Sequence, residues 1–192
     1  MQALIDQHLG NPLILAALLF LAPFVLEEAA ILAAAALVAS GDMAAGVALG
    51  AVALGIVVSD WSLYALGALA GRSRRIRAWI DPAQLVRGHR LLHRGAVPAG
   101  LLARLIPWLL FPVFVASGFL GVGFRRFAAI NGAIALVYVV VLFFGALGLN
   151  VVLLDWLGNW AWAVVGLLLL ALILGGRWAA RRYFPVDDAS AD

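Results

Sequence analysis

Residues 20–41, FLAPFVLEEAAILAAAALVASG, place two adjacent carboxylates, Glu27 and Glu28, in an otherwise almost wholly apolar run. Such a run is long enough to cross a bilayer, whose hydrocarbon core takes about 20 helical residues. Pro23 interrupts it, because an internal proline removes one helical hydrogen bond and clashes with the preceding turn. The stretch therefore predicts two half-helices folded into a re-entrant hairpin, with a single kinked span as the alternative.

The composition is that of an integral membrane protein. The 192 residues are 66% hydrophobic and only 12% charged, whereas about a quarter of the residues in globular domains are charged. The chain has no cysteine, which excludes disulfides, iron–sulfur clusters and thiolate metal sites, and its three histidines are scattered. We therefore expect no metal and no cofactor. Membrane orientation and anionic lipid explain the clustered arginines more simply than nucleic acid does, so no nucleic-acid partner is expected.

Five apolar stretches follow one another along the chain and predict an all-α integral membrane fold. They cover roughly residues 12–40, 44–71, 96–123, 127–150 and 157–176. Prolines break the first stretch at Pro23 and the third at Pro107 and Pro112. The other three stretches are long and mostly uninterrupted, as membrane-spanning helices are. A short polar tail follows at 183–192.

The arginines predict the orientation of these stretches. All except Arg104 gather in three clusters, at 72–94, 125–126 and 177–182, and basic segments of this kind face the cytoplasm. Both ends of 96–123 and the C-terminus then lie on the cytoplasmic side, and a re-entrant hairpin satisfies this where a single crossing does not. The linker 72–95 is expected to be amphipathic and to lie on the membrane surface. The predicted interfacial arginines are Arg72, Arg74, Arg75, Arg125 and Arg126.

A weak internal repeat agrees with this orientation. The repeated segments are ASG at 39–41 and 116–118, and LGALAG at 66–71 echoed by FGALG at 144–148. In this register Glu27 and Arg104 lie at equivalent positions, each fourteen residues before the glycine of its triplet. The repeat predicts two inverted units, 12–71 and 96–150, each a hairpin plus a spanning helix, within a single membrane domain at 1–182. Inverted repeats with broken helices are an architecture of transporters.

Four charged residues lie inside apolar stretches: Glu27, Glu28, Asp60 and Arg104. A charge at the centre of a bilayer costs about 2.5–3.5 kcal/mol on insertion scales. Neutralising a glutamate at pH 7 costs a comparable amount, about 4 kcal/mol, so an acid here can alternate between protonated and charged forms. Arginine stays protonated, so Arg104 requires a carboxylate, a carbonyl, water or an anionic substrate. The residues predict either a proton-coupled site that handles an anion or a purely structural ion pair.

Asp60 shares a helical face with residues that favour a close contact. Tyr64 follows it at i+4 and Gly67 at i+7, and small residues permit close helix packing. We expect this face to meet another helix rather than lipid. If the two hairpins meet tip to tip, Arg104 stands opposite the two glutamates, with Asp60 on the neighbouring helix.

Three motifs resemble the DedA family, also called the SNARE-associated or VTT-domain family, over about residues 12–150. They are APFVLEEAAILAAAALVASG, SDWSLYALG and RLIPWLLFPVFVASGFLGVGFRRFAAINGA. The matching positions are Pro23, Glu28, Gly41, Asp60, Tyr64, Gly67, Arg104, Pro107, Gly118, Arg125, Arg126, Phe127 and Asn131. The chain departs from the family pattern at Leu26, at Glu27 and at Leu110, where the family has a second arginine.

The resemblance implies a multi-pass protein of the bacterial inner membrane with two opposed re-entrant hairpins. Some members are associated with flipping undecaprenyl phosphate, eukaryotic relatives with scrambling phospholipids, and others with proton-dependent tolerance of alkaline pH or drugs. We therefore expect a transporter whose partners are protons and the anionic headgroup of a membrane lipid, and the resemblance leaves a homo-oligomer open. Arg104 and Tyr64 would bind the headgroup, and Glu28, Glu27 and Asp60 would exchange protons.

Two other functions stay open. The same acids would also serve a proton-coupled exporter of small solutes or drugs, or an ion antiporter. A non-transporting membrane-organisation factor is the third hypothesis. We do not expect an enzyme, because no Ser/His or paired-Asp arrangement stands at catalytic spacing in the sequence.

Overall fold

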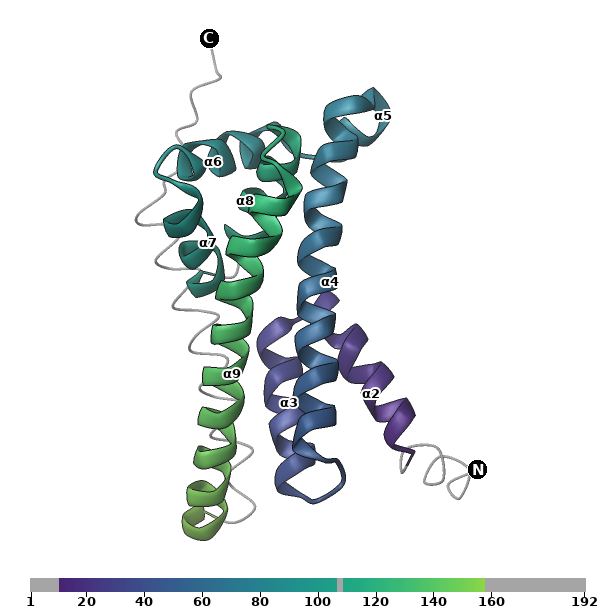
Figure 1. The fold of residues 1–192 in the computed structure, drawn as a ribbon, viewed down its shortest axis with the longest axis vertical. Helices are drawn as coiled ribbons and strands as arrows, with labels where there is room; N and C mark the ends of the chain where they lie inside the picture. The colour runs from purple at the N-terminus through teal and green to yellow at the C-terminus, as the bar shows by residue number, and fades with distance from the viewer. Residues whose placement is uncertain (1–10, 107–108, 158–192) are drawn as a thin grey trace. The chain divides into compact units, whose positions relative to one another are not determined.

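The computed structural model describes residues 11–106 and 109–157, and every element in these ranges is helical (Figure 1). The elements are α2 (Pro12–Leu21), the 3₁₀ helix η1 (Ala22–Phe24), α3 (Glu27–Ala39), α4 (Ala45–Arg72), α5 (Arg74–Arg77), α6 (Pro82–Leu92), α7 (Ala96–Leu105), α8 (Leu110–Phe119) and α9 (Phe124–Leu157). The predicted all-α class is confirmed for this part of the chain. Pro107, the predicted last helix beyond Leu157 and the tail at 183–192 lie outside the described residues.

Two helices are long and apolar enough to cross a membrane: α4, and α9 over Phe124–Leu149. α4 has 28 residues, and at 1.5 Å per residue it is about 42 Å long, against roughly 30 Å for a bilayer core. Both helices lie where the apolar stretches 44–71 and 127–150 predict them, although α9 continues to Leu157. They are the candidates for complete crossings.

The proline-containing stretch at the N-terminal end forms two short helices. α2 has 10 residues and α3 has 13, so they are about 15 and 20 Å long and neither reaches across a bilayer core. The chain reverses direction between them at η1, where Pro23 is buried (Figure 1). The predicted break is present, and its insertion into a membrane as a re-entrant hairpin stays a prediction.

The third apolar stretch is also broken, between α7 and α8, which have 10 residues each. Pro112 does not make this break, contrary to the expectation from the sequence. It is the third residue of α8, and the first N–H groups of a helix have no intrahelical partner, so a proline there breaks no bond. Pro112 is therefore a helix-start residue and not a helix breaker.

Residue contacts divide the chain into two compact units. Among the described residues, unit 1 comprises 11–63 and 123–157 and unit 2 comprises 64–106 and 109–122, so one boundary falls inside α4. The core of unit 1 is formed by α2, α3, the first part of α4, and α9. Its largest fully buried side chains are Ile31, Val52, Ile56, Val139 and Phe143.

Unit 2 is built around α8, on which α6, α7 and the end of α4 pack. A Cβ atom built on Gly67 of α4 would lie 1.9 Å from the carbonyl oxygen of Val115. One built on Gly118 of α8 would lie 2.0 Å from the carbonyl oxygen of Tyr64. The two backbones approach this closely because both glycines lack a side chain. For Gly67, the predicted contact with another helix is confirmed.

The linker 72–95 contains α5 and α6. The apolar face of α6 is turned in part toward α8, because Leu91 is only 3% exposed and a Cβ on Gly88 would lie 2.1 Å from the carbonyl oxygen of Pro112. Trp79, between α5 and α6, is 81% exposed. Protein contacts therefore cover part of a face that the sequence assigned to the membrane surface.

Two helices, α3 and α8, are each followed by a glycine with left-handed backbone. Gly41 follows α3 with φ +83°, and Gly121 follows α8 with φ +72°. Both helix ends close with the Schellman pattern of backbone hydrogen bonds. In this local geometry Gly41 matches Gly121 and not Gly118, with which the ASG triplets pair it. Glu27 follows its break whereas Arg104 precedes the other, so these two residues are not at equivalent positions.

Candidate functional site

Asp60 continues the buried apolar face of α4. Ala48, Val52 and Ile56 lie in the core of unit 1 at four-residue spacing, and Asp60 is the next position of this series. Only 2% of its surface is exposed. A carboxyl group thus occupies a position that the helical pattern assigns to an apolar side chain. Because burying a carboxyl group is costly, Asp60 is the first candidate for function in this unit.

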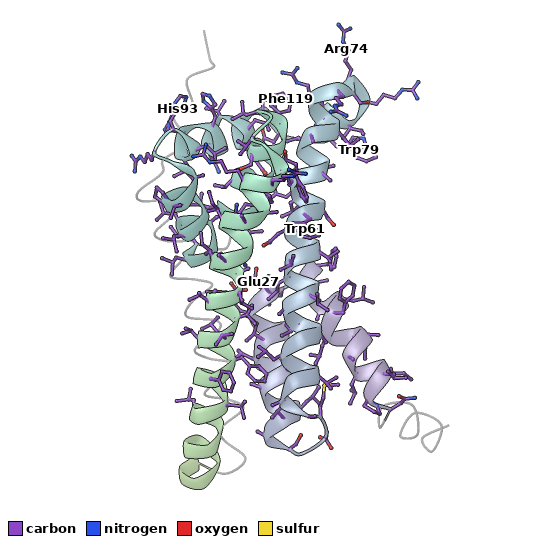
Figure 2. The ribbon with its side chains drawn as sticks, in the orientation of Figure 1. Glu27, Trp61, Arg74, Trp79, His93 and Phe119 are labelled. Carbon is purple, nitrogen blue, oxygen red and sulfur yellow. The ribbon has the colours of Figure 1, made fainter. Side chains whose placement is uncertain are left out.

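Glu27 and Glu28 form the first turn of α3, directly after the break, and Figure 2 shows Glu27 at this end of the helix. Leu26 before them has an extended backbone, with φ −153°, and its side chain accepts no capping hydrogen bond from the helix. The helix macrodipole favours negative charge at this position, because its positive end is here. Both glutamates are half-buried. The helix end therefore favours the charged form of both glutamates, and their partial exposure leaves them accessible to protons.

Tyr138 of α9 contacts one of these acids. Its hydroxyl donates to Oε1 of Glu28 over 3.4 Å, a long hydrogen bond. A hydroxyl donates to a carboxylate and can equally accept from a carboxylic acid, so the contact suits either protonation state of Glu28. Tyr138 is not among the site residues predicted from the sequence. A tyrosine inside the apolar stretch 127–150 is the feature that would have indicated it.

The fold brings Asp60 to the same end of unit 1 as the two glutamates. α3 and α4 run antiparallel and are joined by the turn at 40–44 (Figure 1). Counting equal numbers of residues from this turn places Glu27 level with about residue 57, which is about 5 Å along the helix axis from Asp60. Within the described ranges, no three acidic or histidine side chains could hold one metal ion. Glu27, Glu28 and Asp60 therefore lie toward the same end of the apolar core of unit 1.

Asn131 is a further buried polar residue of unit 1, and only 6% of it is exposed. Its side-chain amide donates to the carbonyl oxygen of Phe127 over 3.1 Å, one turn earlier in α9. It lies four residues before Ala135 and eight before Val139, which are both buried in the core. The predicted motif residue Asn131 thus lies on the buried face of α9.

Arg104 and Tyr64 belong to unit 2. Arg104 lies in the last turn of α7 and is only 4% exposed, and a cation is favoured at a helix C-terminus. The hydroxyl of Tyr64 donates to the carbonyl oxygen of Val122 and so ties α4 to the segment after α8. The opposition of Arg104 and the two glutamates stays a prediction, because the glutamates belong to unit 1.

The arginines predicted to be interfacial differ from Arg104 in their burial. All five are exposed: Arg72, Arg74, Arg75, Arg125 and Arg126. Leu110, which replaces the second arginine of the DedA pattern, is the first residue of α8 and is half-buried. The structure therefore separates a buried cation from the arginines that suit a membrane surface.

The family model of the VTT domain matches residues 22–147. This range contains Asp60, both glutamates of α3, Tyr138 and Arg104. Neither a curated protein nor a solved structure matches the chain.

Proposed function

The chain belongs to the VTT domain family, and from this premise we propose that it is a DedA-type membrane protein that moves an anionic lipid across the bacterial inner membrane in exchange for protons. Asp60 carries the proposal. It is only 2% exposed and lies in a helix that is long and apolar enough to cross a membrane. A buried carboxyl group in such a helix usually marks the pathway of an ion or a proton.

The acids of unit 1 would bind and release the protons. Glu27 and Glu28 are half-buried at the break, so a proton can reach them before it reaches Asp60. The Tyr138 hydroxyl can keep its hydrogen bond to Glu28 when Glu28 gains or loses a proton, because a hydroxyl donates to the charged form and accepts from the neutral one. In this scheme Glu28 and Asp60 are the main exchange sites, and Glu27 is the acid closer to the break.

Arg104 would bind the phosphate of the lipid. Guanidinium stays charged and offers paired donors that match phosphate oxygens. Arg104 is only 4% exposed at the end of α7, and a buried charge attracts an anionic headgroup more strongly than a charge in water does. The hydroxyl of Tyr64 already donates to the carbonyl oxygen of Val122. We therefore propose that Tyr64 holds α4 against the segment after α8 and does not bind the headgroup directly.

Undecaprenyl phosphate or a phospholipid are the lipid classes that fit this scheme. Each carries a phosphate for Arg104 and a chain that stays in the bilayer. The exposed arginines of 72–94 and 125–126 would face the cytoplasm, and so would the C-terminus.

The test uses the full-length chain reconstituted into vesicles, with an imposed pH gradient and a labelled anionic lipid in one leaflet. We expect Asp60→Asn and Arg104→Ala each to slow translocation about tenfold or more, which corresponds to roughly 1.4 kcal/mol of lost stabilisation. Asp42→Asn is the matched control, because Asp42 is an exposed acid in the turn between α3 and α4. It should leave translocation unchanged.

Each outcome separates one hypothesis from the others. Unchanged translocation in both variants would refute the proposal of lipid transport through this site. Proton flux without lipid movement would favour a proton-coupled exporter or antiporter. If the unsubstituted chain moves neither lipid nor protons, the result would favour a non-transporting membrane-organisation factor.

A further inference from the structure

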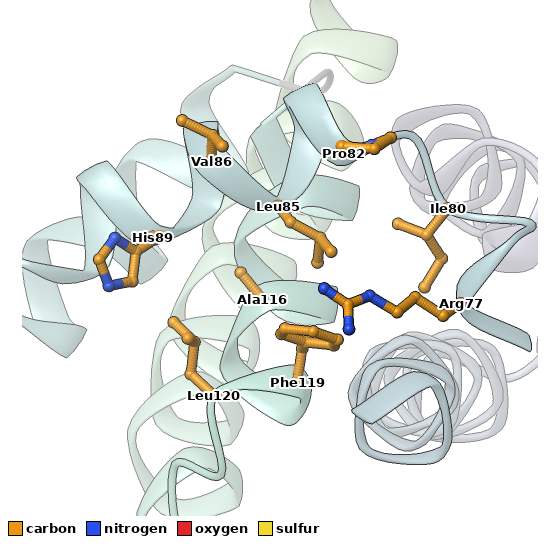
Figure 3. Close-up of a pocket in the computed structure, with 9 residues that line it drawn as sticks. All are labelled: Arg77, Ile80, Pro82, Leu85, Val86, His89, Ala116, Phe119 and Leu120. Atoms are coloured by element: carbon orange, nitrogen blue, oxygen red, sulfur yellow. The ribbon is translucent and has the colours of Figure 1, made fainter. Parts of the chain in front are cut away.

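A pocket of about 340 Å³ opens in unit 2, between the end of α5, α6 and α8 (Figure 3). Its wall is mainly apolar, with Ile80, Leu85, Val86, Phe119 and Leu120 among the lining residues. The volume lies at the lower end of the range of ligand pockets, which is roughly 300–1,000 Å³. The acids of unit 1 and Arg104 take no part in this pocket.

Arg77 supplies the charge of the pocket. Its guanidinium lies over the ring of Phe119, with 5.1 Å between its central carbon and the ring centroid, and Figure 3 shows it extended along the wall beside Ile80. Within the described part of the chain, no carboxylate forms a salt bridge with Arg77. Asp81, the nearest acid in the sequence, caps α6 by accepting from the N–H of Ala83 at 2.9 Å. The guanidinium thus has donors available for an added anion.

The surroundings favour an anion that carries an apolar chain. Residues 72–94 contain seven arginines and one aspartate, a formal charge of +6 with the histidines neutral. Val86 and Leu120 on the pocket wall are 57% and 46% exposed. A free phosphate ion would satisfy Arg77 but would leave these side chains uncovered, whereas an acyl chain would cover them at a gain proportional to the apolar area removed from water.

We propose that this pocket binds one anionic phospholipid as a resident ligand, with its phosphate at Arg77 and the first part of one acyl chain against the apolar wall. The lipid would hold α5 and α6 to α8 at the membrane surface. The inference is independent of lipid transport, because it uses none of the residues assigned to the transport site. It requires only that the chain lies in a membrane.

The experiment measures lipid retained by the intact, full-length chain. The protein is purified from membranes that contain phosphatidylglycerol and phosphatidylcholine, and native mass spectrometry counts each lipid per chain. We expect one phosphatidylglycerol to be retained in preference to phosphatidylcholine. Arg77→Gln should weaken retention about tenfold, the typical effect of losing a hydrogen bond to a charged group. Arg75→Gln, an exposed arginine of α5 outside the pocket, should weaken it clearly less.

A second pair of variants tests the apolar wall. The side chains of Leu120→Glu and Leu120→Gln have nearly the same shape, and position 120 is 46% exposed, so both variants lose the same apolar contact and differ only in charge. Only Leu120→Glu adds a negative charge that repels the anionic headgroup, so it should lower phosphatidylglycerol retention more than Leu120→Gln does. Equal effects of Arg77→Gln and Arg75→Gln, or equal effects of the two Leu120 variants, would overturn the proposal in favour of diffuse attraction. Retention of both lipids to the same degree would overturn it as well.

Discussion

Replacing Gly67 by alanine should destabilise the protein, although alanine is the better helix former. Gly67 lies where α4 crosses α8, and the added Cβ would lie 1.9 Å from the carbonyl oxygen of Val115 and 3.0 Å from the backbone nitrogen of Phe119. The first distance falls about 1.5 Å short of the 3.4 Å at which ordinary van der Waals contact begins. Both obstructing atoms belong to the backbone, so no side-chain rotation can relieve the clash and the helices must separate.

The expected size follows from two opposing effects. Overpacking costs about 1–3 kcal/mol, and a backbone clash belongs at the upper end of this range. Alanine returns about 1 kcal/mol through its helix propensity. The net loss at Gly67 is therefore about 2 kcal/mol, which for a chain of this length lowers the Tm by about 4–8 °C.

The controls lie in the same helix. A Cβ on Gly46 or Gly50 meets nothing within 4 Å, so alanine there keeps the propensity gain and should raise the Tm by up to about 4 °C. Gly118→Ala, on the other side of the crossing, should resemble Gly67→Ala because its Cβ would lie 2.0 Å from the Tyr64 carbonyl oxygen. The assay is thermal unfolding of the purified chain in detergent, followed by tryptophan fluorescence and by the loss of the monodisperse elution peak.

The sign of the difference decides the outcome. If Gly67→Ala and Gly50→Ala shift the Tm in the same direction and by the same amount, the close crossing of α4 and α8 is refuted. A loss at Gly67 without one at Gly118 would mean that only one side of the crossing is tight.

Gly121→Ala should lower the free energy of unfolding by about 1–2 kcal/mol, because L-residues are strained at the φ of +72° that Gly121 adopts. Gly123 has a φ outside that region and open space around it, so Gly123→Ala should change the stability little in the same unfolding assay. Tyr138→Phe removes the hydroxyl that contacts Glu28. It should slow proton-coupled translocation in vesicles while shifting the Tm by only a few degrees. An unchanged rate would show that this contact has no part in proton coupling. Single cysteines at Asp42 and Arg74, which flank α4 in a chain without native cysteine, should react with a membrane-impermeant maleimide from opposite sides, and labelling of both from one side would show that α4 does not cross.

Several features of the fold are predictable because local physics dictates them. Long apolar runs without proline became α4 and α9, since a helix satisfies its own backbone groups in an apolar solvent. Pro23 marks the first break for the same local reason. The exposed arginines likewise follow from their charge, which has no place in an apolar interior.

The candidate site was predictable only in part. Glu27, Glu28 and Asp60 stand out in the sequence because a carboxyl group in an apolar run is costly. Tyr138 does not, because a tyrosine is common enough in apolar helices and gains meaning only from its hydroxyl lying 3.4 Å from Glu28. That pairing joins residues 110 positions apart, and no periodicity in either helix encodes it.

The amino-acid sequence by itself determined the helical class, the membrane character, the places of the long helices and the family, because hydropathy, proline and motif order act along the chain. Tertiary structure decided which residues are equivalent. The ASG triplets suggested that Gly41 corresponds to Gly118, but left-handed backbone at a helix end assigns that place to Gly121, while Gly118 serves a helix crossing. A glycine that ends a helix and one that lets two helices touch look alike in sequence, and only the neighbouring backbone distinguishes them.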